Sequence, residues 1–194
     1  MPTSESPDTP ITVVSGLPRS GTSMMMKMLE AGGMDVLTDQ IRTADDDNPK
    51  GYYEFERVKK ITTDQAWLPE AQGKVVKIIS FLLLKAPSDY RYKVVFMKRA
   101  LPEILASQQQ MLLRRGDNSP QDDVRMAELY EKHLNQACAW LEGQSNIDVL
   151  YVEHRRTLEF PLDVAKQVAD FLGCGLDPVA MASEVDKSLH RQRA

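Results

Sequence analysis

The chain has 194 residues, of which 42% are hydrophobic and 27% charged, and its formal net charge is −4. These values are typical of a globular domain with a substantial core and argue against an intrinsically disordered chain. The small negative net charge argues against a nucleic-acid binder, because such proteins carry excess cations to meet phosphates. We expect one folded domain over residues 11–194, preceded by a polar, proline-rich, disordered tail over residues 1–10.

Several classes of site and location find no support in the sequence. Cys138 and Cys174 lack the close spacing of a metal or redox motif, so we expect no metal site. The longest apolar run, residues 78–84, is far too short to cross a bilayer. The first ten residues lack the cationic and apolar regions of a signal peptide. These features predict a cytoplasmic protein without stable membrane insertion.

The hydrophobic pattern alternates between strand-like and helix-like segments. Short runs rich in β-branched residues predict buried strands at residues 11–14, 75–79, 94–97 and 149–152. Helical patterns follow at residues 22–31, 102–115, 122–141 and 162–172. Strands separated by helices indicate a parallel sheet covered on both faces. We therefore expect an α/β fold, a three-layer α/β/α P-loop-like domain with a central, mainly parallel sheet.

Two polar stretches interrupt this alternation, at residues 38–53 and 115–123. Long loops in compact α/β domains are often lids or substrate-binding loops, but they are also found as plain solvated connections. The sequence leaves both readings open for these stretches.

The strongest chemical signal lies in residues 11–23, where a short strand meets a glycine-containing loop and a helix. Such a unit holds a phosphate, because loop N–H groups and the positive helix N-terminus point at one anion. Gly16 and Gly21 have the spacing of a Walker A motif, but Thr22 stands where a nucleoside triphosphatase carries lysine. The cation is Arg19, inside the loop. This arrangement disfavours ATP or GTP hydrolysis and favours another phosphorylated nucleotide.

The residues Pro18-Arg19-Ser20-Gly21-Thr22 resemble the 5′-phosphosulfate loop of the sulfotransferase family, which uses 3′-phosphoadenosine 5′-phosphosulfate (PAPS) as sulfuryl donor. A second motif also resembles this family: a strand ends in a cation, Arg99, and Ser107 follows eight residues later. In the family this pair holds the 3′-phosphate. The resemblance implies that PAPS is the co-substrate, that PAP is the product and that no metal takes part. The implied cofactor-binding residues are Pro18, Arg19, Ser20, Gly21, Thr22, Ser23, Arg99 and Ser107.

The general base is less well defined. Small-molecule members of the family end a strand with Lys-Thr-His; here Lys77 matches the lysine, but Ile79 replaces the histidine. Other members use a glutamate from the segment after the phosphate loop, and this chain offers Glu54 and Glu56 there. The resemblance favours Glu54, together with Arg19, as catalytic residues. The alternative for Glu54 is an acid at a helix N-terminus, stabilised by the helix dipole.

The remaining basic and imidazole groups receive weaker assignments. His133 falls in the longest predicted helix, where a structural or exposed position is expected, and His154 falls in a largely structural element of the family. Family members place a basic C-terminal segment over the cofactor, which makes Arg191 and Arg193 candidate phosphate contacts. A frayed chain end is the alternative for these two arginines.

The resemblance implies a sulfotransferase that moves a sulfuryl group from PAPS to a hydroxyl or amine. The acceptor is a small molecule, a glycan or a lipid, and the sequence does not select among them or give the oligomeric state. Two other functions stay open. One is a P-loop kinase for a small molecule or nucleoside, which would need magnesium and a donor-site cation elsewhere. The other is a non-catalytic nucleotide-binding module that lacks a base.

Overall fold

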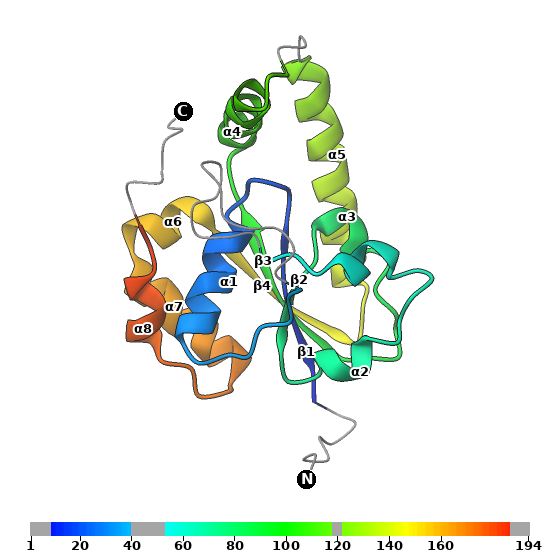
Figure 1. The fold of residues 1–194 in the computed structure, drawn as a ribbon, viewed down its shortest axis with the longest axis vertical. Helices are drawn as coiled ribbons and strands as arrows, with labels where there is room; N and C mark the ends of the chain where they lie inside the picture. Colours follow the sequence, from blue (N-terminus) through cyan, green and yellow to red (C-terminus); the bar gives the residue numbers. More distant parts are fainter. Residues whose placement is uncertain (1–8, 40–52, 118–121, 187–194) are drawn as a thin grey trace.

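A four-stranded sheet forms the centre of the computed structural model, which describes residues 9–39, 53–117 and 122–186. The strands are β1 (Ile11–Gly16), β2 (Val75–Lys77), β3 (Tyr92–Lys98) and β4 (Ile147–Glu153). They lie in the order β2-β1-β3-β4, and every neighbouring pair is parallel (Figure 1). The predicted strands are confirmed to within two residues at each end.

Helices connect the strands and cover both faces of the sheet (Figure 1). The longer helices are α1 (Thr22–Ala31), α4 (Leu101–Arg114), α5 (Asp123–Glu142) and α7 (Pro161–Leu172). The shorter ones are the 3-10 helix Glu56–Lys60 and helices α2 (Leu68–Ala71), α3 (Ser80–Leu83), α6 (His154–Glu159) and α8 (Pro178–Ser183). The predicted helices are confirmed to within one residue at each end, and the α/β fold class is confirmed with them.

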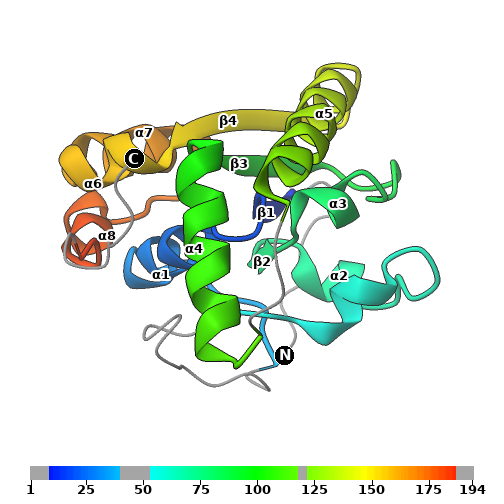
Figure 2. The same cartoon turned by 90° about the horizontal axis from the view of Figure 1, so that it is seen from above.

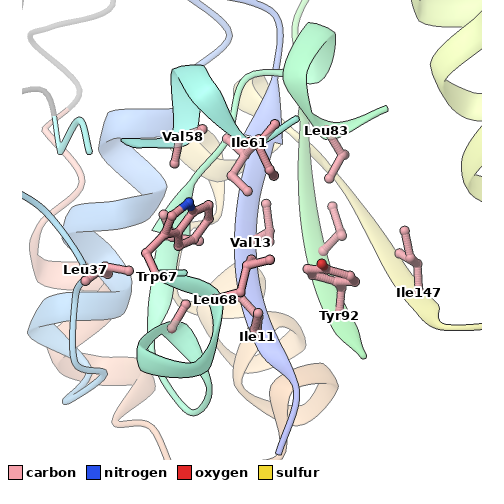
Figure 3. Close-up of a cluster of buried hydrophobic side chains, with 14 of the residues drawn as sticks. Ile11, Val13, Leu37, Val58, Ile61, Trp67, Leu68, Leu83, Tyr92 and Ile147 are labelled. Atoms are coloured by element: carbon pink, nitrogen blue, oxygen red, sulfur yellow. The ribbon is translucent and has the colours of Figure 1, made fainter. Parts of the chain in front are cut away.

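Alternate residues of the strands build two separate cores. On one face, Ile11 and Val13 of β1 pack with Trp67 and Leu68, and the cluster continues to Leu83 of α3 (Figure 3). The other face holds the side chains of opposite parity, and there the strands meet α1, α7 and α8. This second cluster includes Val14, Val95, Met97, Met25, Met28, Val168 and Met181. The two-residue period of the strands thus gives the three-layer arrangement.

The connections between the strands indicate that a ligand binds at the carboxyl ends of the strands. From β1 the chain continues to β2 on one side, and from β3 it continues to β4 on the other side. The connections therefore diverge between the neighbouring strands β1 and β3. In open parallel sheets, ligands bind beyond the carboxyl ends of the strands at such a switch point. The phosphate loop follows β1 and Arg99 follows β3, and α4 and α5 extend beyond this edge (Figures 1 and 2).

Parts of several predictions fall outside the described residues. These are most of the expected N-terminal tail, residues 40–52 of the first polar stretch, residues 118–121 of the second, and the candidate phosphate contacts Arg191 and Arg193. Within the described ranges, no helix combines the length and hydropathy that a membrane span requires.

Candidate active site

The phosphate loop begins with a tight turn that places Arg19 in a strained backbone conformation. The N–H of Ser20 donates to the carbonyl oxygen of Leu17 across 3.1 Å, with Pro18 and Arg19 between them. Arg19 has a φ of 69°. Because proline at the second position excludes the mirror-image turns, a positive φ at the third position is typical of a type II turn, which normally carries glycine there. An L-residue in this region costs about 1 kcal/mol.

Two glycines let the rest of the loop pack closely. Gly16 has a φ of 142°, and a Cβ there would lie 2.5 Å from Ser20 Oγ and 2.6 Å from the Met97 carbonyl oxygen. Gly21 has a φ of 100°, and a Cβ there would lie 2.6 Å from Cδ2 of His154. Neither position has room for a side chain. The Ser20 hydroxyl is buried and makes no hydrogen bond within the described structure.

Gly21 also sets the start of α1. It occupies the N-cap position, and no side chain there accepts from the first N–H groups of the helix. A helix N-terminus carries a partial positive charge and directs N–H groups outward, which favours an anion. The predicted donors Thr22 and Ser23 are the first residues of this helix.

Three of the predicted cofactor-binding residues meet through two hydrogen bonds. Arg19 Nε donates to Ser107 Oγ across 3.0 Å, which joins the loop to α4. Arg99 Nη1 donates to the carbonyl oxygen of Arg19, also across 3.0 Å. The structure thus brings the two sequence motifs together at the switch point between β1 and β3.

Arg99 has a further partner that the sequence analysis did not identify. Its Nε donates to Oε2 of Glu103 across 2.8 Å, and both side chains are only 9% exposed. The spacing of four residues across the start of α4 was the available signal, but charge pairs at this spacing are also common on solvated helix faces. Two of the three guanidinium nitrogens of Arg99 are therefore bonded to protein atoms.

Lys77 adds a second cation beside α1. It ends β2 next to Val14 of β1, and its Nζ donates to Ser23 Oγ across 3.4 Å. The sequence matched Lys77 to the lysine of the family's Lys-Thr-His strand end without giving it a role. In the structure it lies at the helix N-terminus that the loop creates.

The main chain of Glu54 lies at the same edge of the sheet. Its carbonyl oxygen accepts hydrogen bonds from Thr38 Oγ1 at 2.8 Å and from Asp39 N at 3.3 Å. Val36 forms a parallel bridge with Val75 of β2. Thr38 is two residues after Val36 and Lys77 is two residues after Val75, so Thr38 lies level with Lys77 at the end of β2. Glu54 is therefore anchored level with the carboxyl end of β2.

The neighbours of Glu54 separate it from the helix that follows. Glu54 precedes Phe55, which is the N-cap of the 3-10 helix, and the acid in the first turn is Glu56. Glu56 forms a salt bridge with Lys59 at 2.6 Å. The alternative expectation, an acid at a helix N-terminus, is met by Glu56 and not by Glu54.

Tyr53, the residue before Glu54, has a φ of 53°. Its hydroxyl donates a hydrogen bond to the Glu30 carboxylate of α1, and burial raises the pKa of Tyr53 above its ordinary value.

His133 is buried against the residues that follow β2. Its Nε2 lies 2.8 Å from Ser80 Oγ, and its ring stacks on Phe81 with centroids 3.7 Å apart. Burial lowers its pKa, which favours the neutral imidazole. The sequence left open whether His133 is structural or exposed, and in the structure it is buried.

His154 is also buried, and its ring packs on Gly21 of the phosphate loop.

The cysteines take no part in this arrangement. Cys138 is half-buried, Cys174 is exposed, and neither forms a disulfide. Among residues 9–39, 53–117 and 122–186, no three His, Cys, Asp or Glu side chains gather as a possible set of metal ligands.

Comparison with known proteins places this geometry in a known fold. Neither a scan of protein families nor a search of curated proteins finds a match. Among solved structures, the chain is similar to the sulfotransferase domain of the Synechococcus PCC 7002 olefin synthase, with 14% identity and a TM-score of 0.58, over 94% of this chain and 79% of that one. It is also similar to the sulfotransferase domain of the curacin biosynthetic pathway, with 15% identity and a TM-score of 0.55, over 95% and 90%.

A third similar structure is the mouse sulfotransferase SULT7A1 complexed with PAP, with 17% identity and a TM-score of 0.53. That likeness covers 93% of this chain and 64% of the mouse protein. At these identities the likeness concerns the fold. The chain has the α/β fold of the sulfotransferases, in agreement with the resemblance of its two sequence motifs.

Proposed function

We propose that this protein is a PAPS-dependent sulfotransferase that transfers a sulfuryl group to a hydroxyl or amine. The observation that supports this most directly is the meeting of Arg19, Ser107 and Arg99 at the switch point of the sheet. These residues come from the two motifs that resemble the phosphate-binding motifs of the family. One structure of the same fold is a complex with PAP, which supports the nucleotide as a ligand.

The donor groups at this edge suit a nucleotide with phosphates at both ends of its ribose. The 5′ end would meet the loop from Pro18 to Gly21 and the N-terminus of α1, with Thr22, Ser23 and Lys77 as side-chain donors. The buried Ser20 hydroxyl, which makes no hydrogen bond within the described structure, belongs to the same loop.

The 3′-phosphate would meet Ser107 and Arg99. The bond to Glu103 uses the N–H of Nε, and the bond to Arg19 uses one of the two N–H groups of Nη1. The donors that a phosphate would meet are Nη2 and the second N–H of Nη1. The donor set is cationic and rich in hydroxyls, which fits PAPS.

Sulfuryl transfer needs stabilisation of a leaving phosphate and removal of one proton. When bound, PAPS supplies the sulfuryl group, and PAP leaves with the electron pair of the S–O bond that breaks. The permanent charge of Arg19 stabilises the negative charge that develops on the bridging oxygen. Glu54 takes the proton from the acceptor hydroxyl or amine as the new bond to sulfur forms. Its anchored main chain, level with the end of β2, keeps it on the correct edge of the sheet.

The acceptors that this chemistry allows are hydroxyl or amine groups of small molecules, glycans or lipids. An assay of PAP release from PAPS against a panel of these acceptors tests the proposal. We expect release that depends on the acceptor and does not require added Mg²⁺, and that is abolished in Arg19→Ala. Arg155→Ala is the matched control, because Arg155 is 76% exposed on α6. If the same panel is instead phosphorylated with Mg·ATP and yields no PAP, the protein is a kinase.

A further inference from the structure

We infer that Glu103 is a positioning residue for the phosphate loop, and that it acts through Arg99 to hold Arg19 in its left-handed backbone conformation. The inference deepens the proposed function, because this loop is the proposed PAPS-binding loop. Its structural part concerns only the backbone of residue 19 and stands apart from the identity of the nucleotide.

Glu103 sets the direction of the Arg99 side chain. It lies four residues after Arg99, in the first turn of α4, and its carboxylate accepts from Nε across 2.8 Å. A charged bond to Nε fixes the plane of the guanidinium, which is rigid. Held in this plane, Nη1 lies 3.0 Å from the carbonyl oxygen of Arg19. Glu103 therefore determines where Nη1 points.

The bond from Arg99 Nη1 stabilises the left-handed backbone conformation of Arg19. Within the described residues, Arg19 and Tyr53 are the non-glycine residues with positive φ. A type II turn normally has glycine at the position of Arg19, because a side chain there is strained by about 1 kcal/mol. A hydrogen bond from a charged donor contributes about 1.5–3 kcal/mol, which is enough to offset that strain. The bond from Arg99 therefore permits an arginine at the third position of this turn.

The burial of the Arg99–Glu103 pair is consistent with a positioning role. Both side chains are 9% exposed, and burying two charges carries a desolvation penalty that their attraction often does no more than balance. A buried Arg–Glu pair is thus weak as a stabilising device alone. Its value here is geometric, since it aims a donor at one main-chain oxygen that is 80 residues away in sequence.

The test compares the backbone at residue 19 in crystal structures of the parent and of Glu103→Leu, because leucine has no acceptor for Nε of Arg99. We expect a positive φ in the parent and a negative φ in the variant, with loss of the bond from Arg99 Nη1 to the residue 19 carbonyl. Glycine adopts positive φ unaided. The double variant Arg19→Gly/Glu103→Leu should therefore keep the parent turn, a rescue that a purely structural role of the ion pair would not produce.

Glu159→Leu is the matched control. Arg155 pairs with Glu159 at the same four-residue spacing on α6, but these side chains are 76% and 49% exposed. We expect calorimetric titration with PAP to show about tenfold weaker binding for Glu103→Leu, the effect of about one net hydrogen bond, and no change for Glu159→Leu. Should Glu103→Leu fail to fold, Arg99→Met/Glu103→Leu replaces the pair with apolar side chains and provides the same φ readout.

A positive φ and an intact bond to the residue 19 carbonyl in Glu103→Leu would overturn the inference. A change of φ together with no PAP binding by the parent would support the positioning role and contradict the proposed function. The two claims can therefore fail separately.

Discussion

Nε of Arg19 donates to Oγ of Ser107 across 3.0 Å, although 88 residues separate them in the sequence. The bond joins the loop after β1 to helix α4, and the bond from Arg99 to the Arg19 carbonyl joins the same loop to the end of β3. The two motifs that are separate in the sequence thus form one unit. A change in either motif should alter the other.

Ser107→Ala should weaken PAP binding by about tenfold, because it removes a proposed phosphate donor and the acceptor for Arg19 Nε. Isothermal titration calorimetry measures this directly. Ser183→Ala is the control, because Ser183 Oγ donates to a carbonyl oxygen on the exposed surface of α8, away from the loop. Equal PAP affinity in Ser107→Ala and the parent would exclude Ser107 from the binding site.

Arg19→Ala and Arg19→Gly should differ in stability but not in binding. Both remove the guanidinium, so PAP binding should be lost in both. Glycine tolerates the positive φ at this position, whereas alanine retains the strain, so Arg19→Gly should be more stable by about 1 kcal/mol. Urea unfolding of the two variants measures the difference. A lower free energy of unfolding for Arg19→Gly than for Arg19→Ala, as at an unstrained position, would show that residue 19 carries no backbone strain.

Glu54→Gln should lower kcat by about 10²–10⁴-fold and leave PAP affinity unchanged, because a general base acts on the acceptor proton and not on the nucleotide. Glu56→Gln is the matched control, since Glu56 lies two residues away and pairs with Lys59. Steady-state kinetics with the best acceptor and calorimetry with PAP separate the two effects. Full turnover in Glu54→Gln would remove Glu54 from the mechanism.

The stability of the protein should decrease as the pH falls below about 6.5, in part because of His133. Burial lowers the pKa of this imidazole, so the unfolded chain binds a proton at a pH where the folded protein does not. The penalty is absent above the unfolded pKa and grows below it. Urea unfolding at about pH 7.5 and about pH 5.5 should show a smaller pH effect in His133→Gln. An identical pH effect in both proteins would contradict the lowered pKa.

The sequence predicted the elements of the fold well because their signals are local. The two-residue period of the strands and the helical period between them placed every strand and long helix within two residues. The loop glycines and Arg19 stand out by residue type and spacing, whereas Arg99 and Ser107 are assigned through the resemblance to the sulfotransferase family. In the structure, hydrogen bonds join Arg19 to both Arg99 and Ser107, and their roles toward a nucleotide stay a prediction.

The parts that the sequence did not reveal depend on tertiary contacts. Glu103 has the spacing of a common surface pair, and only the packing of α4 over the sheet edge buries it. The sequence shows that Arg19 follows a proline. It does not show that Arg19 has a positive φ or that Arg99 donates to its carbonyl oxygen. The position of Glu54 depends on Thr38 and Asp39, which lie beside β2 because of a bridge that the sequence pattern did not indicate.

The most direct test of the central claim is calorimetric titration of the purified protein with PAP, with Mg·ATP as a parallel ligand. A PAPS-dependent sulfotransferase should bind PAP without magnesium, and Arg99→Ala, which removes both the proposed phosphate donor and the bond to the Arg19 carbonyl, should bind it far more weakly. Absence of PAP binding, together with clear binding of Mg·ATP, would contradict the claim and favour a kinase.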